Sequence, residues 1–197
     1  MNVITDTRDI VGAATHATDA EGLEDHWALQ QWLRSSGLAS QRPSSINKSQ
    51  PAASSMVIRM SDPQPGGTFL IIDKSHNRAL ICKGGYLHLE DAGSIDDGTS
   101  SIPRHWQWLC TERDGFKGFK NVEEGGFLGH NIWWNFYAKV YHHKEWEDFT
   151  LSKREDNYYW IQARHGWTHR ELSAQADGSR VFAEQDGGTP WEFVEVR

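Results

Sequence analysis

The segment HWQWLC at residues 105–110 decides the fold, because it returns in altered form twice along the chain. It reappears as EWEDFTL at residues 145–151 and as PWEFVEV at residues 190–196. Bulky rings recur at alternate positions, as at Trp106 and Trp108, and in a β-strand this spacing places both rings on one face. The pattern predicts three equivalent strands, each closing one repeated unit.

The residues before each closing strand are repeated as well. Each unit contains four short β-like segments separated by Gly, Asp, Asn or charged turns. Trp108, Phe149 and Phe193 are the expected equivalents, 41 and 44 residues apart. The repeats are predicted to cover about residues 66–110, 111–152 and 153–197.

A unit of this size cannot bury its aromatic face alone, whereas three units can close around a common axis. We therefore predict an all-β protein with a pseudo-threefold β-trefoil over residues 61–197. In this arrangement a six-stranded barrel is capped by three hairpins. A propeller of four or more blades would need more units than the chain contains.

Residues 1–60 are predicted to form an N-terminal arm. A helix is expected over about residues 19–36, because Leu23, Trp27 and Leu33 fall on one stripe and acidic residues gather at its start. Its two tryptophans favour docking onto the domain. A linker is expected after the helix, followed by a short strand at Met56–Met60.

Charge and composition exclude several classes of partner and location. The net charge is −7, from 20 Lys and Arg against 27 Asp and Glu, and no stretch supplies the clustered cations that nucleic acid or an anionic membrane requires. No apolar run is long enough to span a bilayer, and no secretory leader is visible, which predicts a cytoplasmic protein. Cys82 and Cys110 are expected to be free, buried thiols.

Residues 106–121 and 126–129 resemble the fascin-like β-trefoil proteins of fungi, with a closing strand, a Gly turn, a Phe-x-Asn strand and then Gly-Phe-Leu-Gly. The resemblance implies the trefoil fold, a fungal source and an association with actin. Bundling of actin, however, uses several trefoils in one chain. Ricin-B-type lectins share this fold and carry a Gln-x-Trp signature, which is absent here because Gln107 is followed directly by Trp108.

The densest group of chemically active side chains lies in the middle unit. Trp133 and Trp134 are adjacent, so they cannot both enter one core from a strand, and an exposed Trp is typical of a binding platform. Packing against the N-terminal helix is the competing interpretation. The predicted ligand-binding residues of this unit are His130, Trp133, Trp134, Tyr137 and His142.

A second group lies in the third unit. Aromatic, imidazole and guanidinium groups are close together there, and such groups suit stacking and hydrogen bonding to a small ligand. The predicted residues are Trp160, Trp167, His169 and Arg170.

Catalytic and cofactor signatures are weak. His165 and His169 are four apart, about 13 Å on an extended strand, which is too far for one metal ion. Glu145 and Glu147 would share a strand face, although acidic residues at this spacing are commonplace. Nucleotide-binding loops and nucleophile elbows are absent from the sequence. We therefore expect no metal and no cofactor.

The leading hypothesis is a protein that binds a small molecule or a glycan through aromatic platforms. The alternative is a cofactor-independent cyclase, isomerase or pericyclase of secondary metabolism, acting on a hydrophobic natural product in a Trp-lined cavity. A protein-interaction module, with actin as one partner, is the third hypothesis.

Overall fold

The computed structural model describes residues 56–93, 95 and 101–197. The predicted N-terminal helix and most of the linker lie outside these residues. The expected strand at Met56–Met60 is present as the two-residue strand β1. Within the described ranges, no helix has the length and apolarity needed to cross a bilayer.

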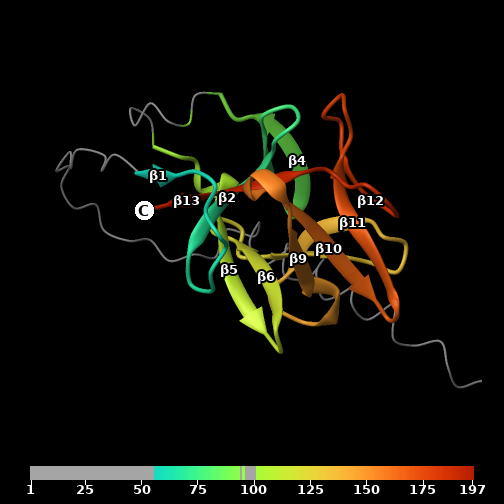
Figure 1. Ribbon diagram of the computed structural model, residues 1–197. Coiled ribbons are helices and arrows are strands. Elements are labelled where there is room, and N and C mark those ends of the chain that lie inside the picture. The colour runs from blue at the N-terminus through green and yellow to red at the C-terminus, as the bar shows by residue number, and fades with distance from the viewer. Residues whose placement is uncertain (1–55, 94, 96–100) are drawn as a thin grey trace, which may run out of the picture. The chain divides into compact units, whose positions relative to one another are not determined.

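The described part of the chain is all-β, which confirms the predicted class (Figure 1). Three short 3-10 helices, η2, η3 and η4, occupy Arg104–Trp106, Glu145–Glu147 and Glu155–Asn157. The strands are β1 (Val57–Ile58), β2 (Thr68–Asp73), β3 (Arg78–Lys83), β4 (Tyr86–Asp91), β5 (Trp108–Arg113), β6 (Phe116–Asn121), β7 (Phe127–His130), β8 (Phe136–Val140), β9 (Phe149–Lys153), β10 (Tyr159–His165), β11 (Thr168–Ala174), β12 (Val181–Glu184) and β13 (Trp191–Val196).

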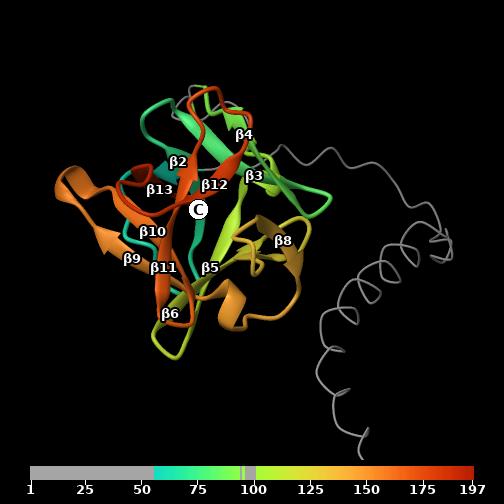
Figure 2. The same ribbon diagram turned by 90° about the vertical axis from the view of Figure 1, so that its right-hand side faces the viewer.

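Six strands close a barrel. Antiparallel pairing runs from β2 through β5, β6, β9, β10 and β13, and β13 pairs with β2 to complete the ring. The remaining long strands form the hairpins β3–β4, β7–β8 and β11–β12, which contact one another (Figure 2). A closed barrel leaves no free edge among its six strands. The architecture is trefoil-like.

Strand register shows the threefold repetition residue by residue. Trp108 pairs with Phe69 on one side and with Asn121 on the other. The equivalent central residue in the next unit is Phe149, and in the last unit it is Trp191. The third equivalent is therefore Trp191, and the predicted Phe193 lies two residues further along the same strand.

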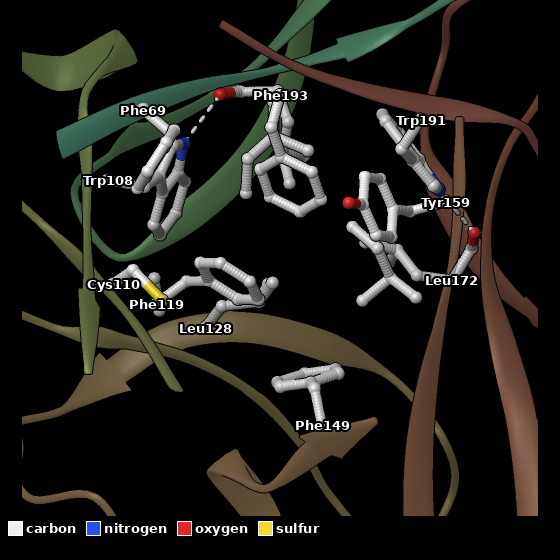
Figure 3. Packing of buried hydrophobic residues seen from close by; sticks show 14 of the residues in the cluster. Phe69, Trp108, Cys110, Phe119, Leu128, Phe149, Tyr159, Leu172, Trp191 and Phe193 are labelled. Carbon is white, nitrogen blue, oxygen red and sulfur yellow. Dashed lines mark hydrogen bonds between the residues drawn. The ribbon is translucent and has the colours of Figure 1, made fainter. Parts of the chain in front are cut away.

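Large rings from all three units fill the barrel (Figure 3). Phe119 and Phe193 stack at 5.4 Å between ring centroids. The indole N–H of Trp108 donates to the Leu80 carbonyl at 2.8 Å, and that of Trp191 donates to the Leu172 carbonyl at 2.7 Å. Burying each ring stabilises the fold by about 2–3 kcal/mol, and the indole hydrogen bonds remove the penalty of a buried polar N–H.

Strand β2 is buried on both faces. Phe69 and Ile71 face the barrel interior, while Leu70 and Ile72 join a second apolar cluster with Val194. Burial on both faces explains why this strand is a nearly continuous apolar run without alternation.

Candidate ligand-binding cleft

In two of the three repeated units, a buried polar side chain at the end of the first strand holds the turn that follows. We call this region of each unit its junction. Asp73 ends β2, accepts a hydrogen bond from the Ser75 N–H at 3.0 Å and pairs with Arg78 at 2.8 Å. Asn121 ends β6, and its amide oxygen accepts from the N–H groups of Glu123 and Glu124. Such side chains satisfy the backbone of a tight turn and fix its path.

The third junction has no polar side chain at the equivalent position. Register places Ala163 at the position of Asp73 and Asn121. Without a polar side chain there to start a turn, β10 continues for two more residues and pairs with β11 as far as His165 opposite Thr168. The result is a hairpin that extends beyond the pairing of β10 with β9. In Figure 2 its turn lies near the β5–β6 turn and the short helix between β8 and β9.

An aromatic cluster surrounds the base of this hairpin. We define the aromatic cluster as His130, Trp134, Trp146 and His165. The rings of His130 and Trp134 stack at 4.7 Å with 7° between their planes, and Trp146 lies 4.7 Å from His165. The Arg170 guanidinium stands over the Trp134 ring at 5.1 Å. These contacts join the β7–β8 turn, η3 and the β10–β11 hairpin.

His130 is fully buried at the centre of the aromatic cluster. Burial lowers the pKa of its imidazole below the ordinary value. Its ring nitrogens lie 3.1 Å from the carbonyls of Asn131 and Arg164. A neutral imidazole carries one N–H, so only one of these contacts is a hydrogen bond at a time. His130 therefore lies between the β7–β8 turn and the end of β10.

The β7–β8 turn separates the two adjacent tryptophans. The Asn131 side-chain oxygen accepts from the N–H groups of Trp133 and Asn135, and Trp134 adopts a left-handed φ of 62°. This geometry directs Trp134 into the aromatic cluster and leaves Trp133 76% exposed. The expectation that only one of the pair can pack inside is confirmed, although the reason is a turn and not strand alternation.

Helix η3 carries Glu145, Trp146 and Glu147, so the prediction that Glu145 and Glu147 share a strand face was wrong. Glu147 is only 1% exposed and accepts a hydrogen bond from the Lys144 N–H at 3.2 Å. Burial raises the pKa of Glu147 to about 7. The side chain is a cap for η3, and Glu145 remains exposed.

A polar network joins the end of β5 to the residue that follows η3. The Arg113 guanidinium donates to Asp148 at 2.6 Å, His143 Nε2 lies 3.0 Å from the same carboxylate, and Thr111 Oγ1 lies 3.2 Å from His143 Nδ1. Burial lowers the pKa of His143. A Cβ at Gly118 would lie 2.7 Å from the imidazole, which explains why glycine occupies that position. The network holds Arg113 in place.

These elements enclose a cleft of about 480 Å³, which we call the junction cleft. It mixes two aromatic rings with guanidinium and carboxylate groups, and the Arg164 guanidinium stands 5.4 Å over the Phe116 ring. The residues that line it are Arg113, Asp114, Phe116, Glu145, Trp146, Asp148, Arg164, His165 and Gly166.

None of the predicted ligand-binding residues lines the junction cleft. Trp134 and His130 belong to the aromatic cluster behind it, Arg170 covers Trp134, and the Tyr137 hydroxyl donates to the His130 carbonyl at 2.9 Å. Four others lie at or near the surface of the same unit or its neighbour, namely Trp133, His142, Trp167 and His169.

Trp160 lies apart from the junction cleft. It stands near the start of β10, opposite Ser152, with the Arg154 guanidinium 4.1 Å from its ring. Its five-residue separation from His165 on an extended strand corresponds to about 16 Å. The structure therefore does not bring Trp160 together with the other predicted residues.

Metal and thiol chemistry find little support among the described residues. In the ranges the structure covers, His, Cys, Asp and Glu nowhere gather in a group of three or more suited to holding a metal ion. Cys82 and Cys110 are free and buried, as predicted, and burial raises the pKa of each thiol to about 11. Both thiols therefore stay protonated near neutral pH and are poor nucleophiles.

No family model matches the chain, and no curated protein matches its sequence. Solved structures do resemble it. A designed threefold-symmetric protein, ThreeFoil, superposes with a TM-score of 0.54 at 18% identity, covering 65% of this chain and 98% of its own. This designed β-trefoil confirms the trefoil-like fold.

Two further structures act on or bind glycans, according to their names. An endo-β-galactosidase from Clostridium perfringens that releases GlcNAcα1-4Gal superposes with a TM-score of 0.54 at 13% identity, over 66% of this chain and 33% of its own. SeviL, bound to asialo-GM1 saccharide, gives 0.50 at 12% identity, over 64% of this chain and 95% of its own. Identities this low show the fold alone.

Proposed function

We propose that this protein binds a glycan in the junction cleft. The observation that carries the proposal is the combination of Trp146 and Phe116 with the charged groups of Arg113, Arg164 and Glu145 in one cleft of about 480 Å³. This volume is in the range of small-ligand sites, about 300–1,000 Å³. A sugar ring offers an apolar face of C–H groups and a rim of hydroxyls, which matches such a lining.

Several features favour a sugar over other small molecules. Carboxylate and guanidinium groups form charge-assisted hydrogen bonds with hydroxyls, while an aromatic ring accepts the apolar face. The Arg113 guanidinium is already hydrogen-bonded to Asp148, so part of the lining is fixed before a ligand arrives. The trefoil-like neighbours that act on or bind glycans support the same reading.

A cyclase or pericyclase acting on a hydrophobic substrate is less well supported. Such an enzyme needs a largely apolar cavity that excludes water, whereas charged side chains make up most of this lining. A protein-interaction role would be favoured by a flat apolar patch of several hundred Å², and the junction cleft is a concave, polar site. The lining of the junction cleft therefore favours a glycan.

The test is a glycan array followed by isothermal titration of the sugars it identifies. Replacing Arg164→Ala should weaken binding about tenfold or more, because it removes charged hydrogen bonds and one wall of the cleft. The matched control is Arg154→Ala, which also removes an exposed arginine that lies over a ring, but at the other end of β10. Equal effects of the two substitutions, or no binding to any glycan, would contradict the proposal.

A further inference from the structure

Trp167 is 100% exposed and lies in the two-residue turn between β10 and β11. Among the tryptophans that the structure describes, only Trp133 is comparably exposed, at 76%. Tryptophan is enriched at interfaces, because its ring offers an apolar face while its N–H stays available for a hydrogen bond. Burial within this domain does not account for the tryptophan at position 167.

The turn itself does not require tryptophan. His165 pairs with Thr168, and Gly166 adopts a φ of +58°, so the positive backbone angle falls on glycine at the first turn position. The second position of such a turn is usually small or polar. The backbone pairing fixes the turn, and the complete exposure of the Trp167 side chain shows that it adds no packing within the described residues.

The position of the turn links Trp167 to the junction cleft. His165 and Gly166, the two residues immediately before it, both line that cleft. Consecutive Cα atoms are about 3.8 Å apart, so the indole begins within one residue of the lining. The Trp167 backbone therefore lies at the edge of the cleft.

We propose that Trp167 is a second sugar subsite, so that the natural ligand is an oligosaccharide that fills the junction cleft and stacks a further ring on Trp167. This inference rests on the proposed glycan-binding function. A sugar ring needs one flat aromatic face and polar groups beside it. Trp167 offers such a face, with the exposed polar residues Arg164, Thr168 and His169 nearby on the same hairpin.

A protein partner or a bilayer fits this site less well. Stable protein interfaces bury about 800 Å² on each side, with several apolar anchors around a centre. Interfacial membrane binding likewise uses a broad apolar face. A single indole among polar neighbours matches one additional sugar ring.

The experiment is isothermal titration of the full chain with three series of one, two and four sugars: galactose and its β-1,4-linked oligomers, glucose and its cello-oligomers, and N-acetylglucosamine and its chito-oligomers. In the series that binds, the tetrasaccharide is expected to bind at least about tenfold tighter than the monosaccharide. Trp167→Ala should reduce this ratio to about threefold or less and leave the monosaccharide affinity unchanged. Trp167→Phe, which keeps a stacking face, should retain most of the ratio.

Tyr86→Ala is the matched control, because Tyr86 is an exposed aromatic residue of another hairpin, and it should leave the ratio unchanged. Binding without any dependence on length, or a length dependence that Trp167→Ala does not alter, would overturn the subsite and leave the cleft proposal standing. Absence of binding by all nine sugars would overturn both. If Trp167→Ala instead abolished sedimentation with phosphatidylcholine–phosphatidylserine vesicles and left the ratio unchanged, the residue would be a membrane anchor and the subsite proposal would be wrong.

Discussion

The junction around Phe149 and Ala163 differs from the two junctions that are its equivalents. At those two, a tryptophan whose indole N–H is hydrogen-bonded lies opposite a polar residue that holds a turn: Trp108 opposite Asn121, and Trp191 opposite Asp73. At the third, both positions are apolar and neither makes those bonds. The extended hairpin and the junction cleft lie at the third junction, so departure from threefold symmetry coincides with the candidate site.

The difference has a physical reason. Asp73 and Asn121 stabilise compact turns by satisfying backbone N–H groups, and a compact turn leaves little room for projecting side chains. Once alanine replaces the polar residue, the strand can continue and carry new side chains beyond the barrel. The two junctions with polar side chains have compact turns, and the third carries the candidate site.

Removing the buried polar side chain from one of the two equivalent junctions should give the largest loss of stability. Asp73→Ala leaves the Arg78 guanidinium without its buried carboxylate and the Ser75 N–H without its acceptor. We expect a loss of about 4 kcal/mol in the free energy of unfolding, measured by urea denaturation. Asp177→Ala is the control, since Asp177 accepts a similar bond from the Ser179 N–H at the surface. Similar losses in the two variants would contradict the distinction between structural and surface turns.

At the third junction, the contribution to stability should instead depend on pH. Burial raises the pKa of Glu147 to about 7 from its ordinary value of 4.5, so the folded state holds this proton more tightly than the unfolded chain. The stability that Glu147 contributes is complete below about pH 4.5 and is lost as the pH rises through 7. Glu147→Gln mimics the protonated form beside Lys144 and Asp148. It should match the wild type at pH 5 and exceed it by about 2 to 3 kcal/mol at pH 8.

Urea denaturation at both pH values measures this difference. Glu145→Gln is the matched control, because Glu145 belongs to the same short helix and is exposed. Its unfolding curve should change with pH as that of the wild type does. If Glu147→Gln showed the wild-type decline between pH 5 and pH 8, Glu147 would already be ionised in the folded protein.

Exchanging the central aromatic residues tests how much each of them contributes to the stability of its junction. Trp191→Phe makes that junction resemble the one at Phe149 and removes the hydrogen bond to the Leu172 carbonyl. The expected loss is about 1.5 kcal/mol, because a buried carbonyl loses a partner and some apolar surface is no longer filled. The reciprocal Phe149→Trp should also destabilise by about 1–3 kcal/mol, since the core has no space for the larger ring. Thermal unfolding of both variants tests this, and a neutral Trp191→Phe would show that the indole bond is dispensable.

The two adjacent tryptophans of the third junction should differ in their contributions, and the substitution of Trp133 should have the smallest effect of all. Trp134→Ala removes the ring stacked on His130 and should reduce stability by about 2 kcal/mol. Trp133→Ala should change stability by less than about 0.5 kcal/mol, because its side chain is 76% exposed. Guanidinium denaturation compares the two directly. Equal losses would mean that the turn, and not the stacking contact, determines their contributions.

The amino-acid pattern was enough to predict the fold class. Period-two aromatic residues and three similar units were sufficient, because each unit must bury the same face and three units can close a barrel. The sequence spacing assigned Phe193 as the third equivalent residue, whereas strand pairing shows that it is Trp191. Loops of unequal length change the spacing between equivalent residues, so spacing alone does not give the register.

Tertiary structure alone decided the candidate site. The sequence indicated where the aromatic and imidazole groups are concentrated, but none of the predicted residues lines the junction cleft. Its lining, however, comes from three turns separated along the chain, represented by Arg113, Trp146 and His165, and only barrel closure brings them together. The decisive residue is the least conspicuous one. An alanine gives no indication of function in the sequence. Its importance follows only from the strand register, which shows that Ala163 occupies the position equivalent to Asp73 and Asn121.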